Sequence, residues 1–103
     1  MAKIIYAVSA LEDIEHIKDY ISIDSVLHAN NFILAIDKKI DVLEKYPEIG
    51  TPVFPDKYNG LRQLLYKSYR IIYHYKNDVV TVVTIHHQSR SLENINPIKD
   101  YTK

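Results

Sequence analysis

The sequence predicts one α+β domain over residues 1–103, in which helices and strands occupy separate parts of the chain. Three observations predict this class. A short β-branched run opens the chain, two stretches with apolar residues at helical spacing follow, and the second half holds three strand-like runs separated by short polar turns. Segregated elements are typical of α+β proteins, whereas regular alternation would indicate a parallel α/β sheet.

The chain begins with a predicted strand and a predicted helix. Residues 3–8 read Lys-Ile-Ile-Tyr-Ala-Val, and β-branched and aromatic residues favour extended backbone. Ser9 and Glu12 then have the spacing of a capping box, in which a serine caps the helix and a glutamate three residues later closes the motif. We therefore expect a helix over residues 10–22.

A second, longer helix is expected directly afterwards. Asp24 or Ser25 can cap its start, and Pro47 ends it, because the residue before a proline leaves the helical conformation. Its apolar residues alternate steps of three and four, which indicates one buried stripe: Val26, Ala29, Ile33, Ile36, Ile40 and Leu43. The short link between the two helices predicts an antiparallel helical hairpin.

The second half predicts a loop and three strands. Residues 47–60 hold three of the four prolines and both glycines, which is typical of a loop. The strands are Leu61–Lys67, Tyr69–Tyr75 and Val79–His87, and their short turns indicate an antiparallel meander. We expect the first strand to join this sheet and the helical hairpin to cover one face. Strict alternation predicts that Val80, Val82, Thr84 and His86 share a face.

Composition excludes several classes of function. The chain has 13 basic and 13 acidic residues, so it lacks the basic excess of proteins that bind nucleic acid mainly through phosphates. It has no cysteine, which excludes disulfides and thiolate metal sites. It has no Gly-rich phosphate loop and no apolar stretch of membrane-spanning length. We expect no cofactor, no metal and no membrane partner, and a cytoplasmic location.

Candidate functional residues gather between Leu61 and Arg90. The arginines are Arg62, Arg70 and Arg90, and the last strand ends in His86 and His87. Arginine can bind phosphate or carboxylate in a bidentate manner. The alternative is that strand arginines pair with helix carboxylates and that the histidines merely mark the strand end. Neighbouring strand residues point to opposite faces, so His86 and His87 cannot ligate one metal ion together.

Four motifs follow one another along the chain between residues 46 and 90. They are Tyr-Pro-Glu-Ile-Gly-Thr-Pro at residues 46–52, Leu61-Arg62-x-Leu64, Tyr69-Arg70-Ile71-Ile72-Tyr73, and Val82-Val83-Thr84-Ile85-His86-His87-Gln88-Ser89-Arg90. With the strand and helical hairpin before them, they resemble the RelE/ParE superfamily of bacterial toxins from type II toxin–antitoxin pairs. The resemblance covers nearly the whole chain and implies a toxin held silent by a cognate antitoxin.

The resemblance implies one of two mechanisms, and the first is enzymatic. RelE-like members cut messenger RNA on the ribosome by attack of a 2′-hydroxyl on the neighbouring phosphate, which needs a base, an acid and cations. In this branch Arg70 matches the family's strand arginine, His86 or His87 would transfer a proton, and Arg90 would clamp phosphate.

Three features weaken the enzymatic interpretation. The lysine cluster of active RelE-like members is reduced here to Lys57 and Lys67. Tyr101 also lies too far along the chain to match a C-terminal catalytic tyrosine. The zero net charge is a further objection, because ribosome binders gain affinity from counterion release.

ParE-like members instead inhibit DNA gyrase and need no nuclease centre. The long second helix, the Pro-Glu-Ile-Gly-Thr-Pro loop, the Leu-Arg-x-Leu strand and the His-x-x-Arg ending are closer to this branch. We therefore favour a gyrase inhibitor without catalytic residues, whose functional surface is Arg62, Arg70, His86, His87 and Arg90. The alternatives are a ribosome-dependent endoribonuclease, with ribosome and mRNA as partners, and a silenced superfamily member. A homodimer stays open as well.

Overall fold

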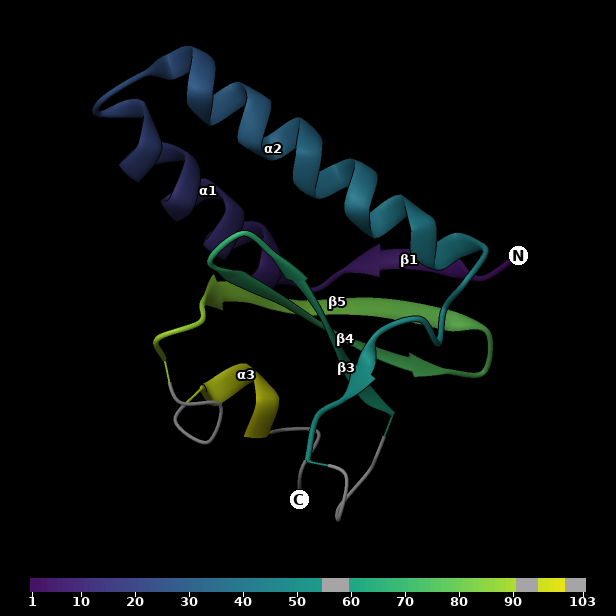
Figure 1. Ribbon diagram of the computed structural model, residues 1–103. Helices are drawn as coiled ribbons and strands as arrows, with labels where there is room; N and C mark the ends of the chain where they lie inside the picture. Colours follow the sequence, from purple (N-terminus) through teal and green to yellow (C-terminus); the bar gives the residue numbers. More distant parts are fainter. Residues whose placement is uncertain (55–59, 91–94, 100–103) are drawn as a thin grey trace.

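The computed structural model describes residues 1–54, 60–90 and 95–99. In chain order the elements are β1 (Lys3–Tyr6), α1 (Val8–Ser22), α2 (Val26–Asp41), the 3₁₀ turn η1 (Val42–Glu44), β2 (Thr51–Pro52), β3 (Leu61–Tyr66), β4 (Tyr69–Lys76), β5 (Val79–His87) and α3 (Asn96–Lys99). Helices α1 and α2 run antiparallel on one side of the sheet, and α3 lies on the other side (Figure 1). The predicted α+β fold with its helical hairpin is confirmed.

The sheet has five strands in the order β1-β5-β4-β3-β2. The predicted meander of β3, β4 and β5 is antiparallel throughout, and β1 joins it by pairing parallel with β5. At the β4–β5 turn Asn77 and Asp78 both have positive φ, at 52° and 62°. Two such residues are what a type I′ hairpin turn requires, and asparagine and aspartate tolerate this conformation.

The first helix starts differently from the prediction, while the second starts as expected. Helix α1 begins at Val8, Ala7 is its N-cap, and no side chain caps it. The expected capping box is wrong because Ser9 already lies inside the first turn, where its hydroxyl donates to the backbone carbonyl of Val83 on β5. At α2, by contrast, the Ser25 hydroxyl accepts from the His28 amide at 3.1 Å.

The core has two parts, one on each face of the sheet. Strand β4 contributes Ile71 and Tyr73 to the part under the helical hairpin, and Ile72 to the part on the opposite face. The first part contains Ile36 and Ile40 from α2, and the second contains Ile98 from α3. Side chains of β4 therefore alternate between the two faces of the sheet, and both faces are covered by apolar contacts.

Strand β5 breaks the strict alternation that the sequence predicted. The register against β4 shifts between Ile72 and Tyr73: Ile72 faces Thr84, but Tyr73 faces Val82. A β-bulge of this kind reverses the side-chain pattern beyond it. Accordingly Val82 and Ile85 share the core under the hairpin, although their odd spacing should place them on opposite faces. The prediction that Val80, Val82, Thr84 and His86 share one face is wrong for this reason.

The loop before β3 is fastened to the sheet by one buried tyrosine. The Tyr73 hydroxyl donates to the Pro47 carbonyl at 2.8 Å and accepts from the Gly50 amide at 2.9 Å. A Cβ atom at Gly50 would lie 2.6 Å from that hydroxyl, so the close approach requires glycine.

Within the described residues, no helix is long and apolar enough to cross a membrane.

Candidate functional site

Two of the predicted residues, Arg70 and His86, lie side by side on the sheet. They are cross-strand partners on β4 and β5, one pair along from Ile71 and Ile85. Because Ile71 and Ile85 face the helical hairpin, Arg70 and His86 point to the opposite face. The Arg70 guanidinium donates to the Gln63 side-chain oxygen at 3.1 Å and to the Gln88 carbonyl at 3.3 Å.

The protonation state of His86 follows from its surroundings. Its side chain is buried, with 4% of the residue exposed. Its Nδ1 lies 3.1 Å from the His87 carbonyl oxygen, which can only accept, so Nδ1 carries the proton and Nε2 is bare. Burial lowers the pKa of His86, and the charges of Arg90 and Arg70 lower it further, against the opposing effects of that carbonyl and of Asp13. His86 is therefore neutral at pH 7.

The Arg70–His86 pair contains one unused donor and one unused acceptor. Arg70 Nε and His86 Nε2 are both buried and have no hydrogen-bond partner. A group that transfers protons to a substrate must come within hydrogen-bond reach of it, and this Nε2 has no contact with solvent. The neighbour of Arg70 is the neutral amide of Gln63 rather than a carboxylate. This arrangement offers no accessible acid or base.

Arg62 lies apart from the other predicted residues and has a structural role. Its Nη1 donates to the carbonyls of Glu48 at 3.0 Å and Gly50 at 2.8 Å, and its Nη2 lies 3.5 Å from the Glu48 carboxylate. These contacts fasten the loop before β3 beside the Tyr73 anchor. The alternative that Arg62 pairs with a helix carboxylate is wrong in detail, because Glu48 belongs to the loop.

His87 and Arg90 line a groove between α1 and the end of β5, which we call the histidine groove. Its volume is about 530 Å³, and its walls are Asp13, His16, Ile17, Tyr20, Tyr69, Ile85, His86, His87 and Arg90. The His87 ring packs edge-to-face on Tyr69 with centroids 5.6 Å apart. The Asp13 carboxylate is already engaged, since it accepts from the Thr84 hydroxyl and, at 3.0 Å, from the Ile85 amide.

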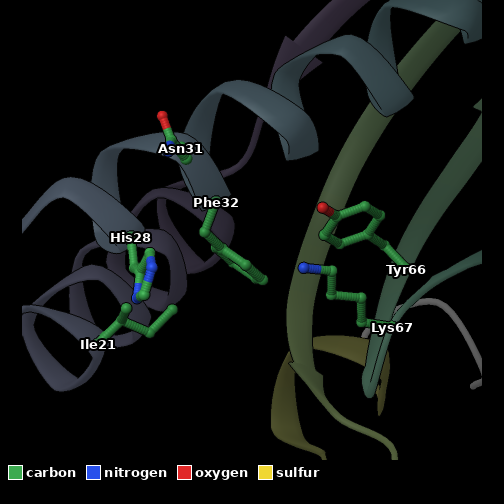
Figure 2. Close-up of a pocket in the computed structure, with 6 residues that line it drawn as sticks. All are labelled: Ile21, His28, Asn31, Phe32, Tyr66 and Lys67. Carbon is green, nitrogen blue, oxygen red and sulfur yellow. The ribbon is translucent and has the colours of Figure 1, made fainter. Parts of the chain in front are cut away.

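A second groove was not predicted from the sequence, and we call it the lysine groove. It measures about 450 Å³ and is lined by Ile21, His28, Asn31, Phe32, Tyr66 and Lys67. Figure 2 shows Phe32 pointing from α2 toward the strands, and the side chains of Tyr66 and Lys67 pointing from the strands toward Phe32. Lys67 sits at the β3–β4 turn with φ of 51°, which is unusual for a lysine. The sequence feature that could have indicated this groove is the turn expected at Ser68, which places Lys67 between two strands.

Four of the five predicted residues lie near one another, and Arg62 lies apart. Arg70 and His86 are cross-strand partners, His86 also lines the histidine groove with His87 and Arg90, and Arg62 binds the residues before β2. Lys57 and Tyr101 lie outside the described residues. Among the residues that the structure describes, no group of three or more His, Cys, Asp or Glu side chains could hold a metal ion.

Comparison with known proteins identifies a matching family by sequence and a similar fold by structure. The sequence model of the family described as "ParE toxin of type II toxin-antitoxin system, parDE" matches residues 4–92. A chain of the solved structure titled "Chromosomal ParDE TA system from P. aeruginosa" is 18% identical, with a TM-score of 0.70 over 84% of this chain and 96% of that one. At this identity the likeness concerns the fold. No curated protein matches at a significant level.

Proposed function

The chain belongs to the ParE toxin family of type II toxin–antitoxin systems, and from this membership we propose that it is a toxin that inhibits DNA gyrase and is neutralised by a cognate antitoxin. The observation that carries the proposal is the family match over residues 4–92, which includes the helical hairpin of α1 and α2, strands β2 to β5 and all but the first residue of β1. His87 and Arg90 in the histidine groove are proposed as its recognition residues on the sheet.

The Arg70–His86 pair supports an inhibitor over a nuclease. Cleavage of RNA by its own 2′-hydroxyl needs a base that can reach the hydroxyl and an acid that can reach the leaving oxygen. The bare nitrogen of His86 is buried, and Arg70 is held by Gln63 and a backbone carbonyl. A binding surface does not have this requirement, because it needs only complementary shape and charge.

The tip of the helical hairpin supports a protein target. Tyr20, Ile23, Val26 and Leu27, which we call the hairpin tip, are between 63% and 80% exposed. Four large apolar side chains at one end of a helix pair form the kind of exposed patch that marks a contact with another protein. We propose that the hairpin tip contacts the target of the toxin.

One pair of assays tests the target. The purified chain is added to gyrase supercoiling and cleavage reactions, and separately to a translating ribosome system with primer extension on the messenger. We expect loss of supercoiling with intact message. Codon-position cuts that disappear in Arg70→Ala would contradict gyrase inhibition, and silence in both assays without a growth defect would indicate a silenced member.

A matched pair of variants tests the hairpin tip. Ile23→Asp should abolish gyrase inhibition, because a charge would be placed in a desolvated contact. Leu34→Asp makes the same kind of change at an exposed leucine further along α2 and should retain inhibition. Circular dichroism confirms that both variants are folded, and equal inhibition by both variants would rule the hairpin tip out.

The antitoxin part of the proposal has its own test. A short neighbouring reading frame would be expressed with the chain, and we expect it to restore growth and to co-purify as a complex. Growth arrest that the neighbouring protein does not relieve would contradict neutralisation by this partner, while the gyrase assay would still decide the target.

A further inference from the structure

Strand β5 pairs with β4 along one edge from end to end, but with β1 along the other edge only in its first part. The pairing with β1 ends at Tyr6 and Val82, and the Ala7 amide donates to the Val82 carbonyl at 2.9 Å. Helix α1 begins at the next residue, so the chain passes directly from β1 into α1, which packs against β5 (Figure 1). Within the described part of the chain, residues 83–87 therefore have α1 in place of a strand along this edge.

Two side chains of α1 bind β5 at this open edge. The Ser9 hydroxyl donates to the Val83 carbonyl, and the Asp13 carboxylate accepts from the Thr84 hydroxyl and, at 3.0 Å, from the Ile85 amide. Ser9 and Asp13 have the i, i+4 spacing that places two side chains on one face of a helix. Together they give the end of β5 hydrogen bonds of the kind that a neighbouring strand would supply.

These hydrogen bonds coincide with the β-bulge. The register of β5 against β4 leaves Val83 without a partner. Burial of Val82 and Ile85 in the same core requires an extra residue between them, and apolar burial alone would accept Thr84 in that place as well as Val83. The contacts from α1 distinguish the two arrangements, because they bind the carbonyl of Val83 and the hydroxyl of Thr84 where the observed bulge places them.

We propose that Ser9 and Asp13 are positioning residues that fix the bulge of β5 at Val83. Beyond the bulge they thereby decide that His86 points away from the hairpin and that the His87 ring lies on the hairpin side. His87 is one of the recognition residues proposed above, and the inference rests on the proposed function for that role alone.

Hydrogen exchange of the ¹⁵N-labelled chain tests the positioning role. In Asp13→Ala the Ile85 amide loses its partner, so its exchange should become about tenfold faster relative to the amides of residues 79–82, which precede the bulge. This ratio should stay unchanged in Asp13→Asn, whose side-chain oxygen can accept the same hydrogen bonds, and in Glu12→Ala, at an exposed carboxylate in the same helix. Equal acceleration before and after the bulge would overturn the proposal, because Asp13 would then only stabilise the fold as a whole.

The titration of the His86 ring, followed by NMR, is a second readout. Burial lowers the pKa of His86, and Arg90 and Arg70 lower it as well, whereas the His87 carbonyl and the Asp13 carboxylate raise it. Asp13→Asn removes the negative charge and keeps the hydrogen bonds, so the pKa should fall further. Asp13→Ala removes the same charge but frees the strand end, so the ring gains contact with water and its pKa should rise toward 6.5. A fall in both variants would overturn the proposal, because it would show loss of charge without movement.

Ser9→Ala is the milder variant and answers the same question if Asp13→Ala does not fold. It removes the donor to the Val83 carbonyl and leaves every charge around His86 in place. It should speed exchange of the Ile85 amide and raise the pKa of His86. An unchanged exchange ratio together with an unchanged pKa would overturn the part assigned to Ser9.

Gyrase inhibition measures the consequence for function. Ser9 lines neither groove, so Ser9→Ala alters the support of β5 without removing a contact of the histidine groove. It should weaken inhibition about two- to tenfold, the effect of one hydrogen bond, while Glu12→Ala should not. Unchanged inhibition by Ser9→Ala would overturn the role of the bulge in recognition. If the unaltered chain does not inhibit gyrase, the proposed target fails, and hydrogen exchange and the His86 titration still decide the role of Ser9 and Asp13.

Discussion

At the scale of single residues, the Arg70–His86 pair is the least expected feature of the molecule. Each side chain keeps one buried polar atom without a partner, which costs about 1–3 kcal/mol per group relative to water. The two unpartnered atoms do not bond to each other, and a positive charge on the buried His86 ring would add a further desolvation cost. The stability of this sheet face should therefore respond to protonation of His86.

This sensitivity predicts a dependence of stability on pH. Since the pKa of His86 in the folded chain lies below its ordinary value of 6.5, the unfolded chain binds more protons between the two values. Stability is therefore full above pH 6.5 and falls as the pH drops toward the folded pKa. Urea unfolding at pH 7.5, 6.5 and 5.5 measures this directly.

Two variants separate the contribution of His86 from that of the other histidines. His86→Leu should flatten the fall in stability below pH 6.5, because the titrating group is gone. His16→Leu, at an exposed position in α1, should leave the fall unchanged. A fall of equal size in the unaltered chain and in His86→Leu would show that other groups cause it.

At the scale of elements, one strand organises the loop that precedes it in the chain. Strand β4 is buried on both faces, and the side chain of its Tyr73 is fully buried. The Tyr73 hydroxyl forms hydrogen bonds with the Pro47 carbonyl and the Gly50 amide. Arg62 on the neighbouring strand binds the same loop from its other side. Residues 47–50 are thus held in place by hydrogen bonds to side chains of the sheet.

The Tyr73 hydroxyl should contribute measurably to stability. Tyr73→Phe keeps the ring in the core but leaves the Gly50 amide and the Pro47 carbonyl without this partner, which should lower the free energy of unfolding by about 1–3 kcal/mol. Tyr46→Phe, at an exposed ring, is the control and should change it little. Urea denaturation followed by circular dichroism measures both, and equal effects would contradict the anchor.

At the scale of the whole molecule, two core parts share one sheet. The helical hairpin packs on one face and α3 on the other, and strands β4 and β5 contribute to both. A disturbance on either face is therefore transmitted through the same hydrogen-bonded strands. One domain over residues 1–103 stays a prediction, and cooperative unfolding would test it.

A single domain should unfold in one cooperative transition. The chain has nine tyrosines and no tryptophan, so tyrosine fluorescence reports mainly on the sheet, while far-ultraviolet circular dichroism reports mainly on the helices. We expect the two urea midpoints to coincide. A separate, earlier loss of helical signal would show instead that the hairpin unfolds independently of the sheet.

The sequence by itself determined the elements, because local periodicity and turn residues act over short distances. The stripe along α2 from Ala29 to Ile40, the Ser25 cap and the turns of the meander followed from patterns within a few residues, whereas Val26, which was expected in the same stripe, is exposed. The α+β class followed from their order along the chain, and the toxin family from motifs that span most of it.

Only the tertiary structure decided how residues distant in sequence meet. Nothing local in β5 indicates the bulge, which arises from its pairing with β4 and reverses the faces beyond it, so that His86 rather than His87 points away from the hairpin. Ser9 donates to Val83 instead of capping α1, because a carbonyl seventy-four residues away lies within reach. The histidine groove and the lysine groove likewise exist only where the helical hairpin meets the strand ends, since side-chain neighbours across elements depend on packing and register.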